Sequence, residues 1–414
     1  MVLVMDKIDL TGKRILITGA AGFIGANLAL RLLKTEHPAK VTGIDNLNDY
    51  YDVRIKEWRL QQIEAAAGAA GAQSVGMDGE GRSCGDAALR EQGSIWRFVR
   101  GDISDAATVE ALFAEERPDI VVNLAAQAGV RYSISNPDSY IRSNIIGFYH
   151  ILEACRHSLE RAGTSPAGTP AAGKAPASAA QADGQAETSG LYRGVQHLVY
   201  ASSSSVYGAN QKVPFSTDDK VDDPVSLYAA TKKSDELMVH AYAKLYNIPS
   251  TGLRYFTVYG PAGRPDMAYF GFTDRLRAGQ MIRIFNYGNC SRDFTYIDDI
   301  VEGTLRVMKG APSRRIGEDG LPVPPCAVYN IGRGKPESLL EFVDILQQEL
   351  VRAGVLPEDY DFEVHKELVP MQPGDVPVTY ADTAALARDY GYCPQTDLRT
   401  GLRKFAQWYQ SFYC

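Results

Sequence analysis

The sequence has few of the features that mark a metal-binding, secreted or membrane protein. Its six cysteines, among 414 residues, form no CxxC pair and no other spacing typical of metal ligands. We therefore expect reduced thiols and no metal site. No apolar run approaches the roughly 18 residues of a membrane-spanning helix. Asp6 and Asp9 follow a short apolar start, which makes it a poor signal peptide, so we expect a cytoplasmic protein.

Positive charge is also limited. There are 43 Lys and Arg residues against 50 Asp and Glu residues, which gives a net charge of −7, and no basic cluster stands out. This balance gives no indication of a nucleic-acid partner. A site for an anionic small molecule must then depend on a few individual arginines.

Large apolar residues are scarce in two stretches, 65–93 and 158–190, which are rich in Ala and Gly. A segment of this composition buries too little apolar surface to offset the entropy that it loses on ordering. We predict that both stretches are mobile insertions at the surface of the protein.

The first patterned element is a short strand, 14–18, that leads into a glycine-rich turn and a helix. Gly19 permits a tight turn, Gly22 lets the backbone approach a pyrophosphate, and Gly25 lets the helix pack closely on the strand. The next strand ends at Asp45, whose carboxylate can accept hydrogen bonds from ribose hydroxyls and would repel a 2′-phosphate. The pattern favours NAD over NADP, and helix capping is the alternative role for Asp45.

Strands at 94–99, 118–124, 195–200 and 250–256 alternate with helices, which predicts an α/β protein with a Rossmann-type doubly wound parallel sheet. Ligands of such sheets bind beyond the carboxyl ends of the strands. The candidate cofactor contacts in these regions are Phe23, Ile24, Asn46, Asp102, Ile103, Leu124, Ala125, Ala126, Asn144 and Tyr255. A helix N-cap is an equal alternative for Asp102, and a buried structural role is an equal alternative for Asn144.

A group of proton-carrying side chains lies between residues 202 and 232. Four serines, 202–205, follow an apolar strand, and Tyr228 and Lys232 are four residues apart, so they share one face of a helix. A nearby ammonium lowers the pKa of a tyrosine hydroxyl, and a serine hydroxyl can pass a proton to a substrate oxygen. The pattern predicts proton transfer to and from a sugar or alcohol hydroxyl. A surface Tyr/Lys pair is the alternative.

Taken together, the motifs resemble those of an extended short-chain dehydrogenase/reductase. They are GAAGFIG, DNLNDYYD, LAAQAGVRYS, YASSSSVYG, YAATK, LRYFTVYGPAGRPDM, SRDFTYIDDIVEG, YNIG, and MQPGDV with YADT. More narrowly, they resemble the bacterial UDP-glucuronate 4-epimerases over nearly the whole chain, apart from the two Ala/Gly-rich stretches. The resemblance implies tightly bound NAD, no metal, and an isomerase that converts UDP-glucuronate to UDP-galacturonate through a transient 4-keto sugar.

The resemblance also implies roles for individual residues. Tyr228 is expected to be the catalytic base, Lys232 to lower its pKa and bind the nicotinamide ribose, and Ser203 to match the family's catalytic Ser or Thr. The candidate substrate contacts are Ser203, Ser204, Ser205, Tyr228, Thr257, Arg264, Arg292 and Asp375.

Arg264, assisted by Thr257, is expected to bind the uronate carboxylate, because a guanidinium fork matches a carboxylate. A 4-keto uronate is a β-keto acid that readily loses this group, so an epimerase must hold it. Neutral-hexose epimerases typically carry Asn where Thr257 stands. Arg292 is the candidate diphosphate clamp and Asp375 a candidate ribose contact. The alternatives are a surface position for Arg264 and an ion pair with a neighbouring Asp for Arg292.

We expect an NAD-binding domain over 1–255, to which 295–335 partly returns, and a nucleotide-sugar-binding lobe formed by 256–294 and 336–414. Helices that begin near Asp138 and Ser226 are expected to form a four-helix homodimer interface, as is usual in the family. The alternative functions are a 4-epimerase of UDP-glucose and UDP-galactose, a 4-epimerase of a UDP-pentose, and a non-catalytic NAD-binding protein.

Overall fold

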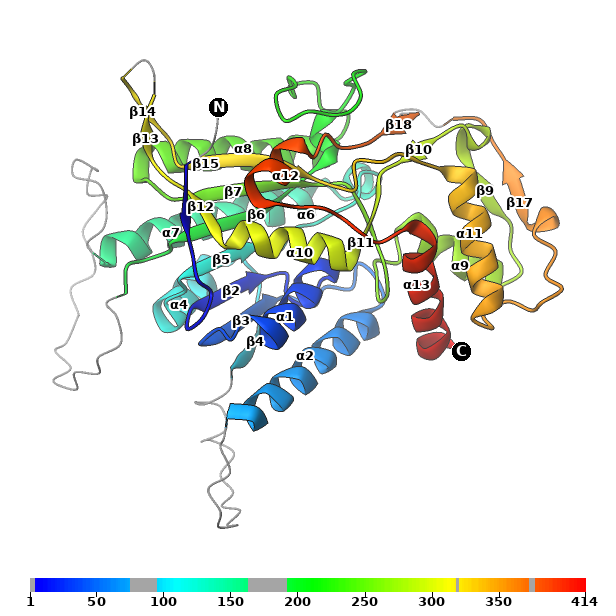
Figure 1. Ribbon diagram of the computed structural model, residues 1–414, viewed down its shortest axis with the longest axis horizontal. Helices are drawn as coiled ribbons and strands as arrows, with labels where there is room; N and C mark the ends of the chain where they lie inside the picture. Colours follow the sequence, from blue (N-terminus) through cyan, green and yellow to red (C-terminus); the bar gives the residue numbers. More distant parts are fainter. Residues whose placement is uncertain (1–3, 75–94, 163–191, 318–319, 372–376) are drawn as a thin grey trace, which may run out of the picture.

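The computed structural model describes residues 4–74, 95–162, 192–317, 320–371 and 377–414. Its centre is a seven-stranded parallel sheet with the order β15-β7-β6-β5-β2-β3-β4 (Figure 1). The strands are β2 (Arg14–Thr18), β3 (Lys40–Asp45), β4 (Trp96–Arg100), β5 (Ile120–Asn123), β6 (His197–Ser203), β7 (Ser250–Tyr255) and β15 (Cys326–Ile331). The strand order reverses between β2 and β5, where such sheets bind ligands. The predicted Rossmann-type fold is confirmed.

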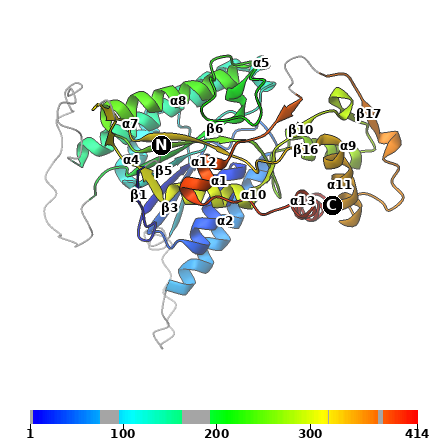
Figure 2. The same ribbon diagram turned by 45° about the horizontal axis from the view of Figure 1, so that its top comes forward.

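Helices cover both faces of this sheet (Figures 1 and 2). One layer contains α1 (Phe23–Thr35), α2 (Val53–Ser74) and α10 (Ile297–Met308), and the other contains α4 (Ala106–Glu116), α7 (Phe148–Arg161) and α8 (Leu227–Tyr246). Successive side chains of a strand point to opposite faces, so Ile15 and Ile17 belong to one hydrophobic core and Leu16 to the other. Burial on both faces explains why the strands are almost continuously apolar.

A smaller lobe lies beyond the carboxyl ends of the strands, at the right of Figure 1. It contains α9 (Ala268–Arg277), α11 (Leu339–Arg352), α13 (Leu398–Tyr413) and the short strands β9 (Ile282–Ile284), β10 (Ser291–Arg292), β16 (Glu337–Ser338), β17 (Lys366–Leu368) and β18 (Val378–Thr379). Part of its core is aromatic, with the ring of Phe270 packed against Phe405 and Trp408. The parallel pair β8 (Thr257–Tyr259) and β11 (Phe294–Tyr296) leads from the main sheet into the lobe.

The remaining elements are short. They are β1 (Met5–Lys7) paired with β12 (Gly310–Pro312), β13 (Arg315–Ile316) paired with β14 (Pro322–Val323), α5 (Tyr132–Ser135), α6 (Pro137–Tyr140), α12 (Ala384–Tyr390), and the turns Ser204–Tyr207, Phe285–Gly288 and Glu363–His365. A π-helical segment, Ile141–Gly147, joins α6 to α7.

Both predicted insertions begin inside helices, so their N-terminal boundaries were wrong. Helix α2 continues to Ser74, because the alanines of its second half have high helix propensity. Helix α7 continues to Arg161, because Ser158 and Leu159 are buried on its inner face. Residues 75–93 of the first predicted insertion and 163–190 of the second lie outside the described residues. Ala162, between Arg161 and the second of these ranges, is described.

Within the described ranges, each helix is too short or too polar to span a bilayer. The same ranges contain no group of three or more His, Cys, Asp or Glu side chains placed to hold a metal ion. The five cysteines within these ranges are free thiols, while Cys84 lies outside them.

A buried ion pair joins helix α8 to strands β6 and β7. The Glu236 carboxylate accepts hydrogen bonds from Arg254 Nε and Nη2, both at 2.8 Å, and from Ser202 Oγ at 2.7 Å. The Glu236 and Arg254 side chains are each only 4% exposed. Burial alone would raise the pKa of Glu236, but the hydrogen bonds from Arg254 and Ser202 lower it overall. The pair therefore fixes α8 against the ends of two strands.

We predict that Glu236→Gln destabilises the protein by about 3–5 kcal/mol at pH 7, because it leaves the buried Arg254 guanidinium without a counter-charge. The folded-state pKa of Glu236 lies below its ordinary 4.5, so the ion pair contributes stability above pH 4.5 that is lost as the pH falls further. Urea unfolding of the two proteins at several pH values should show the difference shrinking below pH 4.5.

The matched control is Glu302→Gln. Glu302 also pairs with two arginines, Arg31 and Arg306, but its side chain is 37% exposed. An exposed pair contributes at most about 1 kcal/mol. Equal losses in the two variants would contradict the importance assigned to the buried pair.

Candidate active site

A cavity of about 1190 Å³ opens where the carboxyl ends of the strands meet the smaller lobe. Its walls come from the turn after β2, the loops after β3, β4 and β5, the end of β6, the start of α8, and parts of residues 255–292. Every residue predicted to contact cofactor or substrate lines it, except Asn144 and Asp375. Asp375 lies outside the described residues.

The three glycine positions of the turn after β2 have no room for a side chain. Gly19 has a positive φ of 68°, and a Cβ atom there would lie 2.7 Å from the backbone nitrogen of Ala125. A Cβ atom at Gly25 would lie 2.3 Å from the carbonyl oxygen of Gly19. Helix α1 begins at Phe23, and no side chain caps its N-terminus. The N–H groups of its first turn can therefore bind an anionic group.

Two carboxylates line the cavity near the ends of β3 and β4. Asp45 accepts hydrogen bonds from the backbone N–H groups of Ala21 at 3.1 Å and Leu47 at 2.9 Å. Asp102 accepts from Asn46 Nδ2 at 2.9 Å and from the Ser104 N–H at 2.8 Å. Burial opposes ionisation of Asp102, but these hydrogen bonds lower its pKa overall, so it remains a carboxylate.

The helix-cap alternatives receive no support at these two positions. Helix α4 is capped by Asp105, whose side chain accepts from the Ala107 N–H, rather than by Asp102. Asp45 precedes a loop, and helix α2 begins eight residues later at Val53. Both carboxylates thus line the cavity, Asp45 at the end of β3 and Asp102 just beyond the end of β4.

Asn144 supports the wall of the cavity from behind. Its side-chain oxygen accepts from the Gln127 N–H at 2.8 Å, and its Nδ2 donates to the Gln127 carbonyl at 3.1 Å and to Thr231 Oγ1 at 3.0 Å. The residue is 1% exposed and does not line the cavity. The structure therefore favours the structural alternative: Asn144 ties the loop after β5 to α8. It belongs to the π-helical segment, which sequence periodicity did not predict.

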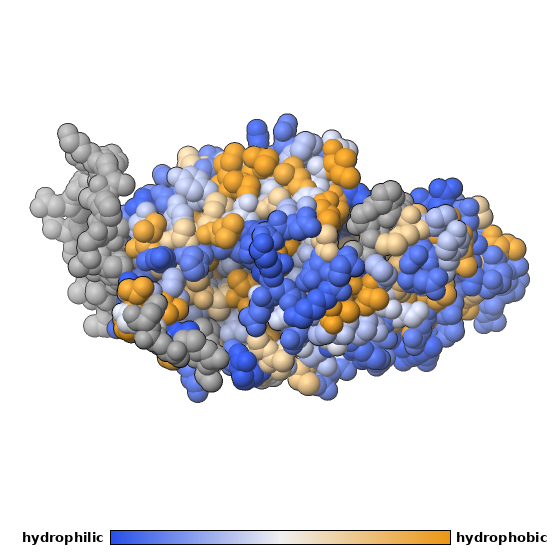
Figure 3. Space-filling view, turned by 90° about the horizontal axis from the view of Figure 1, so that it is seen from above, coloured by the Kyte–Doolittle hydropathy of each residue, from blue (hydrophilic) through white to orange (hydrophobic). Residues whose placement is uncertain are grey.

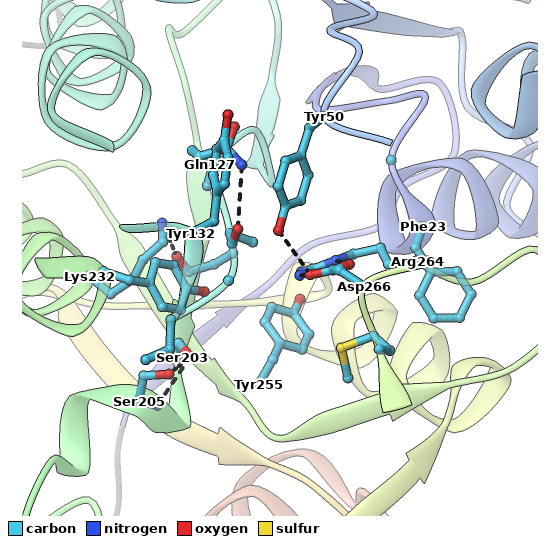
Figure 4. Close-up of a pocket in the computed structure, with 18 of the residues that line it drawn as sticks. Phe23, Tyr50, Gln127, Tyr132, Ser203, Ser205, Lys232, Tyr255, Arg264 and Asp266 are labelled. Atoms are coloured by element: carbon cyan, nitrogen blue, oxygen red, sulfur yellow. Dashed lines mark hydrogen bonds and ion pairs between the residues drawn. The ribbon is translucent and has the colours of Figure 1, made fainter. Parts of the chain in front are cut away.

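The three predicted proton-transfer residues all line the cavity, and Figure 4 shows Ser203 and Lys232 on the same side of it. Tyr228 and Lys232 lie on the first turns of α8, which the Ser226 side chain caps by accepting from the Ala229 N–H. Ser203 is the last residue of β6, and its Oγ donates to Ser205 Oγ at 3.1 Å. All four serines, 202–205, line the cavity, but Ser202 Oγ is engaged by Glu236.

Lys232 is held by two buried acceptors. Its Nζ donates to the Ala201 carbonyl at 3.0 Å and to Asp235 Oδ2 at 2.9 Å. An ammonium has three N–H bonds, so one is available for a ligand. Burial raises the pKa of Asp235 to about 6, in spite of the opposing effect of Lys232. Asp235 was not predicted from the sequence, because an acid three residues after a lysine is common on helix surfaces.

Arg264 lines the cavity across from Lys232 and Ser203 (Figure 4). Its guanidinium binds the Asp266 carboxylate through Nε at 2.9 Å and through Nη2, and the two side chains are 27% and 26% exposed. The Tyr50 hydroxyl also donates to Asp266, at 3.2 Å. Arg264 is therefore a partly exposed residue at the cavity wall, with its guanidinium paired to Asp266.

Thr257 and Arg292 lie farther along the same cavity. Arg292 Nη1 donates to the carbonyl oxygens of Ser291 at 3.0 Å and Pro377 at 3.1 Å. The neighbouring Asp293 carboxylate instead accepts backbone N–H groups, those of Arg333, Gly334 and Ala381. The Arg292 guanidinium is thus held by backbone carbonyls at the wall of the cavity.

Sequence reasoning assigned no role to several residues that line the cavity: Tyr50, Arg131, Tyr132, Asp266, Arg283 and Phe285. The Arg131 guanidinium lies 5.5 Å from the centre of the Phe285 ring, so it bridges the main domain and the smaller lobe. Tyr50 and Asp266 lie within two of the family-like motifs, DNLNDYYD and GRPDM, and this location could have indicated a role for them.

A doubly wound sheet with a glycine-rich turn, two carboxylates that line the cavity near the strand ends and a Ser/Tyr/Lys group defines a nucleotide-cofactor-binding protein of the short-chain dehydrogenase/reductase class. The sequence model of the NAD dependent epimerase/dehydratase family matches residues 15–332. The chain belongs to this family.

Relatives and solved structures are similar over nearly the whole chain. Protein CapI of Staphylococcus aureus is 43% identical over 406 residues, which cover 97% of this chain and 99% of that protein. UDP-glucuronate 4-epimerase 4 of Arabidopsis thaliana is 40% identical over 408 residues, which cover 97% and 76%. A crystal structure of UDP-glucuronic acid 4-epimerase from Bacillus cereus, in complex with UDP-glucuronic acid and NAD, has a TM-score of 0.69 at 28% identity and covers 96% and 99%.

We predict that Gly25→Ala loses bound dinucleotide, because the new Cβ atom would lie 2.3 Å from the Gly19 oxygen and would force the turn open. NAD released by acid and measured by chromatography should fall to less than about a tenth of the wild-type content, a loss of about 1.4 kcal/mol or more in binding. Gly68→Ala in helix α2 is the control, since nothing lies within 4 Å of its Cβ position. Wild-type NAD content in the Gly25 variant would contradict this role of the turn.

Proposed function

We propose that this protein is an NAD-dependent UDP-glucuronate 4-epimerase that produces UDP-galacturonate. The observation that carries the proposal is the placement of Arg264 in the same cavity as Ser203, Tyr228 and Lys232. A carboxylate-binding group thus lies in the cavity that holds the proton-transfer group. The similarity to UDP-glucuronate 4-epimerases supports the same conclusion.

The described residues fit NAD. The turn at Gly19, Gly22 and Gly25 has the side-chain-free surface and the uncapped helix N-terminus that a pyrophosphate needs. Asp45 would accept from the ribose hydroxyls, and Asp102 with Ile103 would contact the adenine. Bound NAD supplies a reversible hydride acceptor next to the sugar. The nicotinamide end would lie toward Lys232 and Tyr255.

The chain's own contribution to the reaction is proton transfer. Tyr228 removes the proton from the sugar 4-hydroxyl and later returns it, so the substrate alternates between an alcohol and a 4-keto sugar. Lys232 stabilises the phenolate by its charge and binds the nicotinamide ribose with its remaining N–H bond. Ser203 orients the 4-oxygen and relays the proton, with Ser204 and Ser205 as neighbouring contacts.

Arg264 and Thr257 hold the uronate carboxylate. In the 4-keto sugar this carboxylate is β to a carbonyl, so it can leave as carbon dioxide. A guanidinium fork that binds it stabilises the anionic form and opposes that loss. Farther along the cavity, Arg292 would bind the diphosphate, and the backbone of 281–286 would bind the uracil.

The proposal also includes the two-lobe division at residues 255 and 256, with 295–335 returning to the NAD-binding domain, and action in the cytoplasm. A 4-epimerase of UDP-glucose or of a UDP-pentose would use the same proton-transfer residues. Such an enzyme has no substrate carboxylate for Arg264 to bind. A non-catalytic NAD-binding protein has no use for the combination of Ser203, Tyr228 and Lys232.

The test is incubation of the purified protein with UDP-glucuronate and, separately, with UDP-glucose, with the products resolved by NMR. We expect UDP-galacturonate to form without added cofactor. Tyr228→Phe should lower kcat by at least about a hundredfold, the size of a lost general base, while the thermal midpoint stays unchanged. Turnover of UDP-glucose alone would favour the neutral-sugar epimerase, and unchanged turnover in the variant would refute Tyr228 as the base.

We also propose a homodimer whose interface contains helices of the 138–161 segment and α8. Apolar side chains are exposed along these helices: Ile141, Ile146, Tyr149, Leu237 and Leu245. In Figure 3 hydrophobic residues gather along the upper edge of the molecule, on the side where Figure 2 shows α7 and α8. A second copy of the chain would remove this surface from water.

We predict that the double variant Ile146→Asp, Leu237→Asp is monomeric in light scattering, because it places charge in an apolar interface, whereas the wild type has the mass of two chains. The control is Ile316→Asp, since Ile316 is 67% exposed on the separate strand β13. A monomeric wild-type protein would contradict the proposed dimer.

A further inference from the structure

The guanidinium of Arg264 is bound on one edge by a carboxylate of the protein itself. Nε donates to Asp266 Oδ1 at 2.9 Å, and Nη2 donates to Asp266 Oδ2. These two parallel hydrogen bonds fix both the position and the plane of the guanidinium. A guanidinium has five N–H bonds, so three remain on Nη1 and Nη2. The edge formed by Nη1 and Nη2 can therefore bind a second carboxylate while Asp266 keeps its place.

Asp266 is in turn held from the opposite side of the cavity. The Tyr50 hydroxyl donates to Asp266 Oδ2 at 3.2 Å, and Figure 4 shows the Tyr50 ring directed at the Arg264–Asp266 pair. Burial, assisted by the Asp266 charge, raises the pKa of Tyr50 to about 12, so this hydroxyl keeps its proton at neutral pH. The Tyr50 ring packs against Tyr132 with centroids 4.7 Å apart.

The hydroxyl of Tyr50 also lies against a glycine. A Cβ atom at Gly129 would be 2.8 Å from it, so the loop after β5 can approach Tyr50 only without a side chain there. Tyr50, Asp266 and Arg264 thus form a chain of hydrogen bonds that begins on the loop after β3 and ends beside the reacting sugar. Tyr50 restricts the position of Asp266, and Asp266 restricts the position of the Arg264 guanidinium, which carries the charge that would bind the substrate.

We propose that Asp266 and Tyr50 are positioning residues that set the selectivity for uronates by fixing the Arg264 guanidinium. This inference rests on the proposed function. A guanidinium held in one plane presents a fixed fork to the C6 carboxylate and binds it in one orientation. Without Asp266, the arginine can adopt several side-chain conformations, and the carboxylate is held less firmly in each.

A second consequence concerns the 4-keto sugar. Loss of C6 breaks the C5–C6 bond, and its electron pair moves into the C4 carbonyl to give an enolate while carbon dioxide leaves. The enolate then takes a proton at C5 and becomes a 4-keto pentose. No oxidant beyond the one that formed the 4-keto sugar is needed. The carboxylate loses its negative charge as carbon dioxide leaves, so a guanidinium that is held in place to bind the charged form opposes the loss.

The experiment compares Asp266→Asn and Tyr50→Phe with the wild type, using UDP-glucuronate labelled with ¹³C at C6 and unlabelled UDP-glucose. We expect KM for UDP-glucuronate to rise about tenfold in the Asp266 variant. This is about the effect on binding of losing one charge-assisted hydrogen bond between Arg264 and the substrate carboxylate. The Tyr50 variant should show a smaller rise. In both variants kcat/KM should fall less for UDP-glucose than for UDP-glucuronate, and labelled carbon dioxide should form a larger share of the product.

The matched control is Asp52→Asn. Asp52 makes a similar two-bond contact with Arg54, two residues away, but it does not line the cavity. Asp52→Asn should leave KM for UDP-glucuronate, kcat/KM for UDP-glucose and the share of labelled carbon dioxide unchanged. Asp266→Asn could lower the thermal midpoint. Tyr50→Phe removes only one oxygen atom and so disturbs the fold less, and in that case it tests the positioning role in its place.

The outcomes separate this inference from the proposed function. A wild-type protein that does not convert UDP-glucuronate would refute the proposed function itself. A wild-type epimerase whose Asp266 and Tyr50 variants keep the same KM ratio between the two substrates, and release no more labelled carbon dioxide, would refute only the positioning role. Equal losses with both substrates would indicate a merely structural role and would also overturn it.

Discussion

The Arg59 guanidinium holds the two sides of the cavity together. It is 1% exposed and donates to the Ala21 carbonyl at 2.9 Å, in the glycine-rich turn. It also donates to the carbonyls of Ala262 at 2.6 Å and Gly263 at 3.1 Å, just before Arg264. A buried carbonyl without a donor is costly, so one side chain satisfies groups from two loops far apart in the sequence. The glycine-rich turn and the loop that leads to Arg264 are therefore positioned by the same residue.

Paired charges also shape the cavity. Lys232 lies against Asp235, and Arg264 lies against Asp266, so each cation that would meet the substrate is oriented by its own carboxylate. A charge-assisted hydrogen bond is directional, and a pair held in this way loses little additional entropy when a ligand arrives. The cavity can thus keep fixed cations beside a tyrosine without a strongly basic surface, which agrees with the net charge of −7.

Much of the fold followed from local pattern. The central strands lie within a few residues of their predicted positions, because burial on both faces leaves short apolar runs that end at polar turns. The wrong predictions concern features that the local spacing of apolar residues does not indicate. Alanine-rich sequence after residue 65 was taken for an insertion although α2 continues through it to Ser74. The π-helical segment around Asn144 was taken for regular helix, because one extra residue in a turn hardly changes the apolar spacing.

Groups that depend on close spacing could be predicted from the sequence: the glycine turn, Asp45 at a strand end, and Tyr228 with Lys232 on one helix face. Helix and strand periods constrain residues a few positions apart, so these groups could be placed before the fold was known. Contacts between distant groups, in contrast, depend on the tertiary structure. Tyr50 and Asp266 are 216 positions apart in the sequence, and Asn144 and Thr231 are 87 apart. No local period relates such residues. Tyr50 and Asp266 meet because parallel strands bring their carboxyl ends to one edge of the sheet, and Asn144 and Thr231 meet because two helical segments pack together.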